Sequence, residues 1–173
     1  MDDMRSVVEA LVFASDVPVT VERLKDVLGE TDRKAILEML QDIELEYRQR
    51  RGGLCLMEVA GGYQFRTRAE FAPWIRKLRG IRPVPLTPAA METLSVVAYR
   101  QPVTRQEVEK IRGVDVSGSL KGLLEKKLVR IVGRKNVPGK PSMYGATRRF
   151  LEVFDLKDLS ELPTLREITE MEE

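Results

Sequence analysis

The chain has 173 residues, of which 43% are hydrophobic and 32% are charged, as expected for one or two globular domains. It contains no histidine and a single cysteine, which excludes Ser-His-Asp and Cys-His nucleophiles, the usual zinc ligand sets and internal disulfides. The sequence has no membrane-spanning run, secretory signal pattern or phosphate-binding glycine loop. We therefore expect a cytoplasmic protein that is not an enzyme and that needs no cofactor or metal.

The first half begins with an apolar helical pattern and continues with two further helices. Thr20 is a suitable N-cap for a helix that runs through Leu28 and is ended by Gly29. A longer helix is predicted over residues 32–50 from its apolar spacing. The residues expected on its buried face are Ile36, Leu37, Leu40, Ile43 and Tyr47.

A tight hairpin follows, with strands at residues 54–59 and 63–66 and a Gly61-Gly62 turn. Cys55 lies in its apolar first strand, which favours a buried, inert thiol. A closing helix comes next, and its large apolar residues are interpreted as core packing rather than as a ligand-binding aromatic site. These residues are Phe71, Trp74, Ile75 and Leu78.

The two halves meet in a proline-bearing connector over residues 80–88, and we place the domain boundary near residue 82. Thr87 and Pro88 are a good N-cap and first residue for the helix that follows. The tail that begins at residue 161 is acidic and poor in large apolar residues, which predicts disorder.

The second half contains a capping box, in which Thr104 and Glu107 satisfy each other's backbone amides at the start of a helix. That helix carries Val108 and Ile111 on one apolar face and ends at Gly113. Asp115 or Ser117 can cap the next helix. Its predicted core stripe is Leu120, Leu123, Leu124 and Leu128. Strands at residues 129–132 and 143–146, joined by a long Gly/Pro-rich loop, then predict a second hairpin.

A Pro-Val-Thr motif occurs at residues 18–20 and again at 102–104, each time within the same order of elements. Helix, helix, turn, helix and hairpin is the winged variant of the helix-turn-helix. The predicted fold is therefore α+β, mainly α, with two tandem winged-helix domains. The predicted domains are residues 1–81 and 82–160, followed by a tail at 161–173.

Charge is unevenly distributed, because residues 80–149 hold fourteen Lys and Arg against five Asp and Glu. A basic winged helix suggests weak, non-specific DNA contact, and the candidate residues are Lys121, Lys126, Arg134 and Lys135. The third helix of this domain offers no Arg, Asn or Gln, which disfavours base readout. Its Gly118 and Gly122 leave two interpretations open, close approach of a partner backbone or tight packing inside the domain.

The motifs of the second half together resemble the segregation and condensation protein B family. They lie at residues 98–105 (AYRQPVTR), 111–115 (IRGVD), 138–141 (PGKP) and 150–163 (FLEVFDLKDLSELP). The first half resembles the family through its organisation and through Glu9-Ala10-Leu11 with Phe13. Lys140 stands where the family pattern has arginine, so the charge is kept but the bidentate fork is lost.

This resemblance implies a bacterial cytoplasmic, nucleoid-associated protein that forms a homodimer through its first domain and binds a kleisin subunit, largely through its second. The kleisin would connect it to an SMC ATPase in a complex that condenses and segregates chromosomes during cell division. Mapped onto this sequence, the expected partner-binding residues are Tyr99, Arg100, Arg105, Arg112, Asp115, Lys140 and Tyr144. The residues expected at the dimer interface are Val8, Leu11 and Val12.

Intramolecular roles remain open for several of these residues. Each has an alternative role within the chain: Asp115 as a helix cap, Arg112 as the partner of a nearby acid, Tyr144 as packing in the hairpin, and Val8 as packing in the core. Two other functions also remain open. One is a winged-helix DNA-binding transcriptional regulator, and the other is an enzyme with carboxylate chemistry, for which no motif is present.

Overall fold

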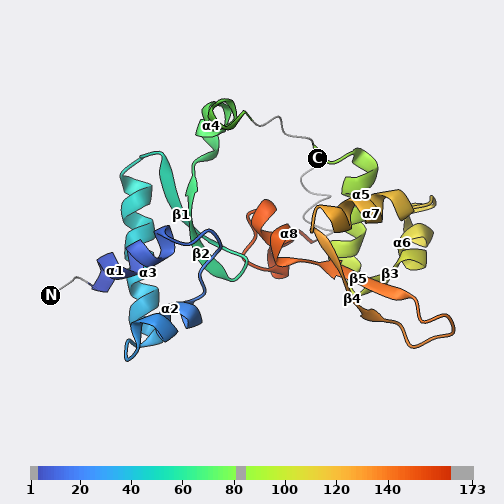
Figure 1. Ribbon diagram of the computed structural model, residues 1–173, viewed down its shortest axis with the longest axis horizontal. Helices are drawn as coiled ribbons and strands as arrows, with labels where there is room; N and C mark the ends of the chain where they lie inside the picture. The colour runs from blue at the N-terminus through green and yellow to red at the C-terminus, as the bar shows by residue number, and fades with distance from the viewer. Residues whose placement is uncertain (1–3, 81–84, 165–173) are drawn as a thin grey trace. The chain divides into compact units, whose positions relative to one another are not determined.

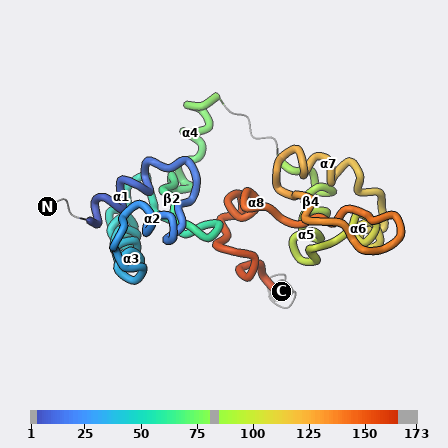
Figure 2. Tube along the Cα trace, turned by 60° about the horizontal axis from the view of Figure 1, so that its bottom comes forward, coloured from blue at the N-terminus to red at the C-terminus, as the bar shows by residue number. Residues whose placement is uncertain are grey.

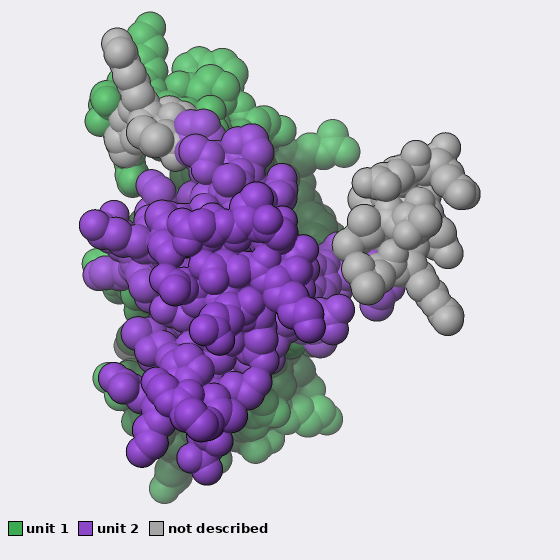
Figure 3. Space-filling model, turned by 90° about the vertical axis from the view of Figure 1, so that its right-hand side faces the viewer, with its two compact units in different colours: residues 1–83, 156–158 green, residues 84–155, 159–173 purple. Residues whose placement is uncertain are grey.

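The computed structural model describes residues 4–80 and 85–164 and contains helices together with two small antiparallel sheets (Figure 1). The predicted mixed, mainly helical composition is confirmed. The chain forms two compact units, residues 1–83 with 156–158 and residues 84–155 with 159–173 (Figure 3). The predicted boundary at residues 81 and 82 and the tail residues 165–173 lie outside the described residues.

Unit 1 consists of three helices, a hairpin and a short closing helix. These elements are α1 (Met4–Phe13), α2 (Val21–Leu28), α3 (Arg33–Gln49), β1 (Leu54–Val59), β2 (Gly62–Thr67), the 3-10 turn η1 (Ala69–Phe71) and α4 (Ala72–Arg79). Thr20 caps α2 as predicted, since its hydroxyl accepts from the amide of Arg23 at 3.1 Å. Gly29 ends the helix with a φ of 69°.

The core of unit 1 lies where α3 packs against α1, α2 and β1 (Figures 1 and 2). Ile36, Leu40 and Ile43 are fully buried along α3, in agreement with its predicted apolar face. Leu37 and Tyr47 are only partly buried against this cluster. The 3.6-residue period therefore locates the centre of the buried stripe, while residues at its margin stay partly in solvent.

The first hairpin turns one residue earlier than predicted. Val59 pairs with Gly62, so the turn residues are Ala60 and Gly61, both with positive φ (51° and 71°). Gly62 is required for another reason, because a Cβ there would lie 2.8 Å from the backbone of Val19. The close approach of Val19 also forms an isolated bridge with β2.

The closing helix α4 corrects the core-packing interpretation. It has no buried residue, and the side chains of Trp74 and Leu78 are 67% and 87% exposed. Phe71 and Ile75 are half-buried. The helix has only eight residues and packs chiefly on η1, the turn immediately before it. The amphipathic pattern of residues 71–78 thus predicted a helix correctly, but Trp74 and Leu78 on that helix face solvent.

Unit 2 consists of four helices around a three-stranded sheet of order β3-β5-β4. Its elements are α5 (Pro88–Arg100), β3 (Val103–Thr104), α6 (Arg105–Arg112), α7 (Ser117–Glu125), β4 (Val129–Arg134), β5 (Ser142–Ala146), α8 (Arg148–Val153) and the 3-10 turn η2 (Leu159–Glu161). The capping box is confirmed in both directions between Thr104 and Glu107. Gly113 ends α6 in the left-handed region, also as predicted.

The apolar face predicted for α6 is wrong at one of its two residues. Val108 is fully buried, whereas Ile111 is 54% exposed. The neighbouring Arg112 is the residue that reaches α5 from this last turn, through its guanidinium. Leu120 and Leu123 of α7 and Leu128 after it are buried as predicted, while Leu124 is half-buried. Within the described residues, no helix is long and apolar enough to cross a membrane.

Candidate protein-binding site

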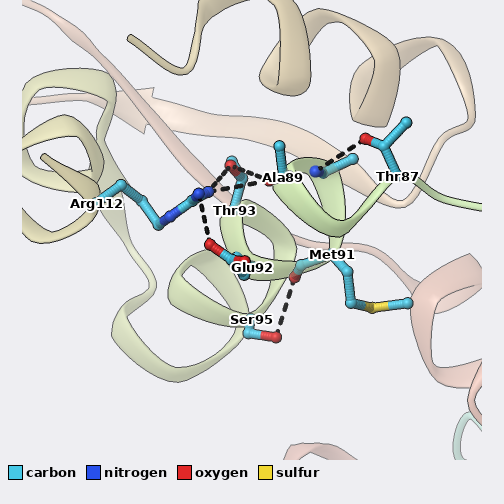
Figure 4. Close-up of polar contacts among 8 residues, drawn as sticks. Thr87, Ala89, Met91, Glu92, Thr93, Ser95 and Arg112 are labelled. Carbon is cyan, nitrogen blue, oxygen red and sulfur yellow. Dashed lines mark hydrogen bonds and ion pairs between the residues drawn. The ribbon is translucent and has the colours of Figure 1, made fainter. Parts of the chain in front are cut away.

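Arg112 joins α6 to the first turns of α5 (Figure 4). Its guanidinium donates to the carbonyl of Ala89 at 3.0 Å and to the hydroxyl of Thr93 at 2.9 Å, and pairs with Glu92 at 2.5 Å. Only 14% of the Arg112 side chain is exposed, and Thr93 is fully buried. Thr93 in turn donates to Ala89 at 2.8 Å. Arg112 therefore acts inside the unit, where it fixes the angle between two helices.

A second polar cluster links the starts of α6 and α7. Arg105 donates to the Ser117 hydroxyl at 2.9 Å and pairs with Glu109 at 3.5 Å. The Ser117 hydroxyl donates to a carboxylate oxygen of Asp115 at 2.7 Å. Hydrogen bonds from Ser117 lower the pKa of Asp115. Asp115 is thus held as an anion beside the α7 N-terminus, and half of the Arg105 side chain (52%) remains exposed on this cluster.

The capping box is tied to the second hairpin. Lys135, next to the end of β4, pairs with Glu107 at 2.6 Å. This contact and the hydrogen bonds from Thr104 lower the pKa of Glu107 to about 2. The Glu107 carboxylate therefore binds both the N-terminus of α6 and the base of the hairpin loop. Lys135 consequently has part of its charge engaged within the chain, unlike the other DNA-contact candidates.

Tyr99 and Arg100 lie at the C-terminal end of α5, and both are exposed. The Tyr99 hydroxyl donates to the carbonyl of Pro163 at 2.7 Å, which holds the segment after α8 against α5 within unit 2. The side chain of Tyr99 is nevertheless 42% exposed. The end of α5 therefore presents one aromatic and one cationic side chain to solvent.

Tyr144 and Lys140 belong to the second hairpin. Tyr144 is half-buried in β5, where it pairs with Val103 on one side and Ile131 on the other. Lys140 lies in the loop before β5, is exposed, and has a φ of 39°. Tyr144 is near the start of α6 in this sheet, because its pairing partner Val103 lies two residues before Arg105.

Two residues that position the hairpin were missed at the level of sequence. The side-chain oxygen of Gln101 accepts from the amide of Ala146 at 2.8 Å, and its amide group donates to Ala98 at 3.0 Å. A Cβ on Gly145 would lie 2.9 Å from that same oxygen. Gln101 thus joins the end of α5 to β5, and Gly145 leaves room for it. Gln101 lies within the motif at residues 98–105 and Gly145 within the predicted strand at residues 143–146, but neither pattern indicates the contact between them.

The remaining DNA-contact candidates, Lys121, Lys126 and Arg134, are exposed. On the same helix, a Cβ on either Gly118 or Gly122 would meet nothing within 4 Å. Tight packing inside the unit therefore does not explain these glycines.

The residues expected at the dimer interface require a correction. Val8 and Val12 are 0% and 1% exposed because they pack into the core of unit 1, and Leu11 is partly buried against the same core. The side chains of Val8 and Val12 are therefore not on the surface of the unit, whereas Leu11 keeps part of its surface exposed. The large apolar residues that α1 exposes are Met4, at 40%, and Phe13, at 66%. Helical periodicity grouped Val8, Leu11 and Val12 on one apolar face of α1, but it does not show whether that face packs into the core or faces solvent.

Cys55 is half-buried, and its thiol lies 3.5 Å from the carbonyl of Arg66 across the hairpin. Among the described residues, no group of three or more Cys, Asp and Glu side chains is arranged to hold a metal ion.

The sequence comparisons define the class of protein. A family model for the segregation and condensation complex subunit ScpB matches residues 6–165. Segregation and condensation protein B of Syntrophotalea carbinolica is 47% identical over 98% of this chain and 85% of its own. The Myxococcus xanthus protein of the same name is 45% identical over 98% of this chain and 51% of its own.

A solved structure of a dimer of the ScpB N-terminal domain complexed with an ScpA peptide is also similar. It is 28% identical over 43% of this chain and 93% of its own, with a TM-score of 0.40, which is too low to argue from. The family model and the sequence identities over nearly the whole of this chain carry the assignment. The chain belongs to the segregation and condensation protein B family, in agreement with the resemblance found in its motifs.

Proposed function

We propose that the protein is a non-enzymatic accessory subunit of a bacterial condensin-like SMC–kleisin complex. It would bind the kleisin subunit in the cytoplasm, at the nucleoid, and support chromosome condensation and segregation during cell division. The observation that carries this proposal is the family match over residues 6–165, together with relatives named segregation and condensation protein B. ATP hydrolysis would belong to the SMC partner, which is consistent with the lack of a phosphate-binding loop here.

Two winged-helix domains are proposed, residues 1–81 within unit 1 and residues 82–160, which form most of unit 2. The order of elements supports this, since three helices precede a hairpin in both units. In unit 2 the hairpin also pairs with the short strand β3 that precedes α6. Such a sheet beside a helix-turn-helix is the expected form of a wing.

The kleisin is proposed to bind chiefly on unit 2, through Tyr99, Arg100, Arg105, Lys140 and Tyr144. Arginine and tyrosine are enriched among the residues that dominate binding energy at protein interfaces. Arg112 and Asp115 are proposed as positioning residues, because their polar groups are engaged with α5 and with Ser117. Unit 1 is proposed to form the homodimer.

Direct DNA contact is proposed to be weak and non-specific, through Lys121, Lys126 and Arg134 with a smaller share from Lys135. The exposed cations support phosphate contact. The pairing of Lys135 with Glu107 reduces the charge available from the hairpin. The alternative of a transcriptional regulator is not favoured, because α7 offers no Arg, Asn or Gln for base readout.

The test is co-purification of the full chain with a kleisin fragment, followed by titration calorimetry. A stoichiometric complex should form without DNA. Arg100→Ala and Arg105→Ala should each weaken it by about 10-fold or more, as interface arginines do. Arg23→Ala, an exposed arginine on α2, is the matched control and should change affinity less than about 2-fold. No association with the kleisin, combined with nanomolar binding to one DNA sequence, would overturn the proposal.

A further inference from the structure

Helix α4 exposes apolar side chains for which the proposed function supplies no partner. Trp74 is 67% exposed, and Leu78, one helical turn later, is 87% exposed. The helix buries no residue and stands apart from α1, α2 and α3 in both views of unit 1 (Figures 1 and 2). Single exposed apolar residues are common on protein surfaces, but contiguous groups of them mark interaction sites. A partner that covers α4 must therefore offer apolar atoms.

The polar residues of α4 are all cationic. Arg76, Lys77 and Arg79 lie in its last turn, and all three side chains are exposed. Residues 71–80 contain no Asp or Glu, and within the described part of the chain no ion pair engages these three cations. Their charge is therefore available to solvent, and a partner of opposite charge is attracted to this helix.

The cations border the apolar side of the helix. Because successive residues are rotated by about 100°, Trp74 and Leu78 lie only about 40° apart around the helix axis. Lys77 then lies about 60° to one side of Trp74, and Arg79 lies about 40° beyond Ile75 on the other side. Ile75 is half-buried, so Trp74 and Leu78 form the outward part of the apolar side. An apolar strip bordered by cations is typical of a helix that lies in the surface of an anionic bilayer.

Two other classes of partner fit α4 less well. A bound peptide needs a groove, and the open hollow of unit 1 is lined by residues 6–13 and 47–54, none of which belongs to α4. The backbone of DNA would meet the cations, but its phosphates leave Leu78 without an apolar contact. A bilayer surface supplies both, since its anionic headgroups meet the cations and its hydrocarbon boundary accepts Trp74 and Leu78.

We propose that α4 is a peripheral membrane-contact element that binds the headgroup region of a bilayer containing anionic phospholipid. An eight-residue helix is far too short to cross a bilayer, which takes about 20 residues, so it lies along the surface. Trp74 and Leu78 enter the boundary between headgroups and hydrocarbon, while the three cations face the phosphates. Each cation strengthens binding to an anionic surface by about 5-fold, so three of them on a short helix give weak and reversible contact. The inference goes beyond the proposed function and does not depend on kleisin binding.

The test uses Trp74 itself as the reporter, because the chain contains a single tryptophan. The purified full chain is titrated with vesicles of phosphatidylcholine alone and with vesicles that also contain phosphatidylglycerol. Tryptophan emission should shift to shorter wavelength, and the protein should sediment with the vesicles, only where the anionic lipid is present. Added salt should weaken this binding, since it screens the attraction between charges near a surface.

Two variants separate the charged from the apolar contribution. Arg76→Gln combined with Lys77→Gln removes two cations and should weaken vesicle binding by about 25-fold, at about 5-fold for each. Leu78→Ala should weaken it by about 5-fold or more, because less apolar surface then leaves water on binding. All three side chains are exposed, and circular dichroism with thermal melting establishes that each variant is folded.

The matched controls lie on α2 of the same unit. Arg23→Gln combined with Lys25→Gln removes two exposed cations, and Val27→Ala shortens an apolar side chain that is 54% exposed. Unlike α4, this helix also carries two acids, Glu22 and Asp26. These substitutions should leave vesicle affinity within about 2-fold of wild type, as surface changes outside a binding site do.

Weaker vesicle binding by the α4 variants, with the α2 variants unchanged, supports the inference. Absence of both the emission shift and sedimentation with anionic vesicles overturns it. Equal binding by the wild type and the α4 variants also overturns it, because the lipid contact then lies on another surface. If duplex DNA, a kleisin fragment or a rise in protein concentration shifts the emission while vesicles do not, α4 belongs to that partner and the membrane assignment is wrong.

Discussion

The two units share an order of elements but differ in how each is closed. In unit 2 the short helix α8 buries Phe150, and the centre of its ring lies 4.9 Å from the centre of the Phe154 ring. In unit 1 the short helix α4 buries nothing and exposes Trp74. Both helices follow a hairpin and carry large aromatic residues. The aromatic content of a helix therefore does not decide whether the helix joins the core.

The difference lies at the N-terminus of each helix. Thr147 caps α8 and also donates to the carbonyl of Lys127 at 2.6 Å, which fixes the helix against the end of α7. The residue at the same position of α4 is Phe71, and it makes no side-chain capping hydrogen bond. A cap that binds the rest of the unit sets the direction of the helix, whereas an uncapped helix is oriented only by the few contacts it makes.

The largest expected effect tests this contrast directly. Phe150→Ala should lower the free energy of unfolding of unit 2 by about 3 kcal/mol or more, because it leaves a cavity in the core. Trp74→Ala should change that of unit 1 by less than about 0.5 kcal/mol at dilutions where the chain is monomeric. Urea denaturation measures both. Comparable losses for the two substitutions would mean that α4 is packed as firmly as α8.

A second contrast concerns the residue before the glycine that ends the second helix. Unit 1 has Leu28 there, partly buried against the core, and unit 2 has Arg112 with its three α5 partners. Arg112→Leu should destabilise unit 2 by about 1–3 kcal/mol, since the carbonyl of Ala89 loses a charged donor. Denaturation of the Glu92→Gln variant separates the salt bridge from the hydrogen bonds and should cost less.

The two equivalent N-caps should differ in strength. Thr104 is 3% exposed and takes part in a reciprocal capping box, whereas Thr20 accepts one amide at 3.1 Å. Thr104→Ala should cost about 1–2 kcal/mol and Thr20→Ala about 0.5–1 kcal/mol, measured by thermal unfolding. Equal costs would show that the reciprocal bond from Glu107 adds nothing to the simple cap.

The smallest effect is the pH dependence that Glu107 contributes to the stability of unit 2. The folded-state pKa of Glu107 is about 2, below its ordinary value of 4.5, because of Lys135 and the Thr104 amide and hydroxyl. A lowered pKa contributes stability above pH 4.5, and this contribution is lost as the pH falls toward 2. The wild type should lose more stability than Glu107→Gln across that interval in a series of thermal melts. Parallel curves for the two proteins would contradict the assigned pKa.

Local rules predicted the parts of the fold that depend on local chemistry. The caps Thr20 and Thr104, the closing glycines and the α3 stripe follow from hydrogen-bonding groups within a few residues of one another. The errors arose where a tertiary neighbour decided the outcome. Ile111 was assigned to the core because its spacing allowed it, but Arg112 occupies the contact with α5.

The candidate site was predictable only as a set of residue types. The motifs singled out Arg112 and Asp115, but their partners on α5 and α7 bring them into intramolecular roles that spacing does not reveal. Lys135 and Glu107 lie 28 residues apart, and only the hairpin brings them together. The exposed Phe13 differs from the buried Val12 by one position, so its role depends on which side of α1 the rest of the unit covers.

The open surroundings of Gly122 mean that the free protein is less stable than its own fold permits. A methyl group there would meet nothing within 4 Å, and alanine in a helix interior is favoured over glycine by about 1 kcal/mol. Natural proteins are rarely at their stability optimum, so such a glycine persists without any steric requirement for it. The fold therefore holds a reserve of stability that one substitution, Gly122→Ala, can release.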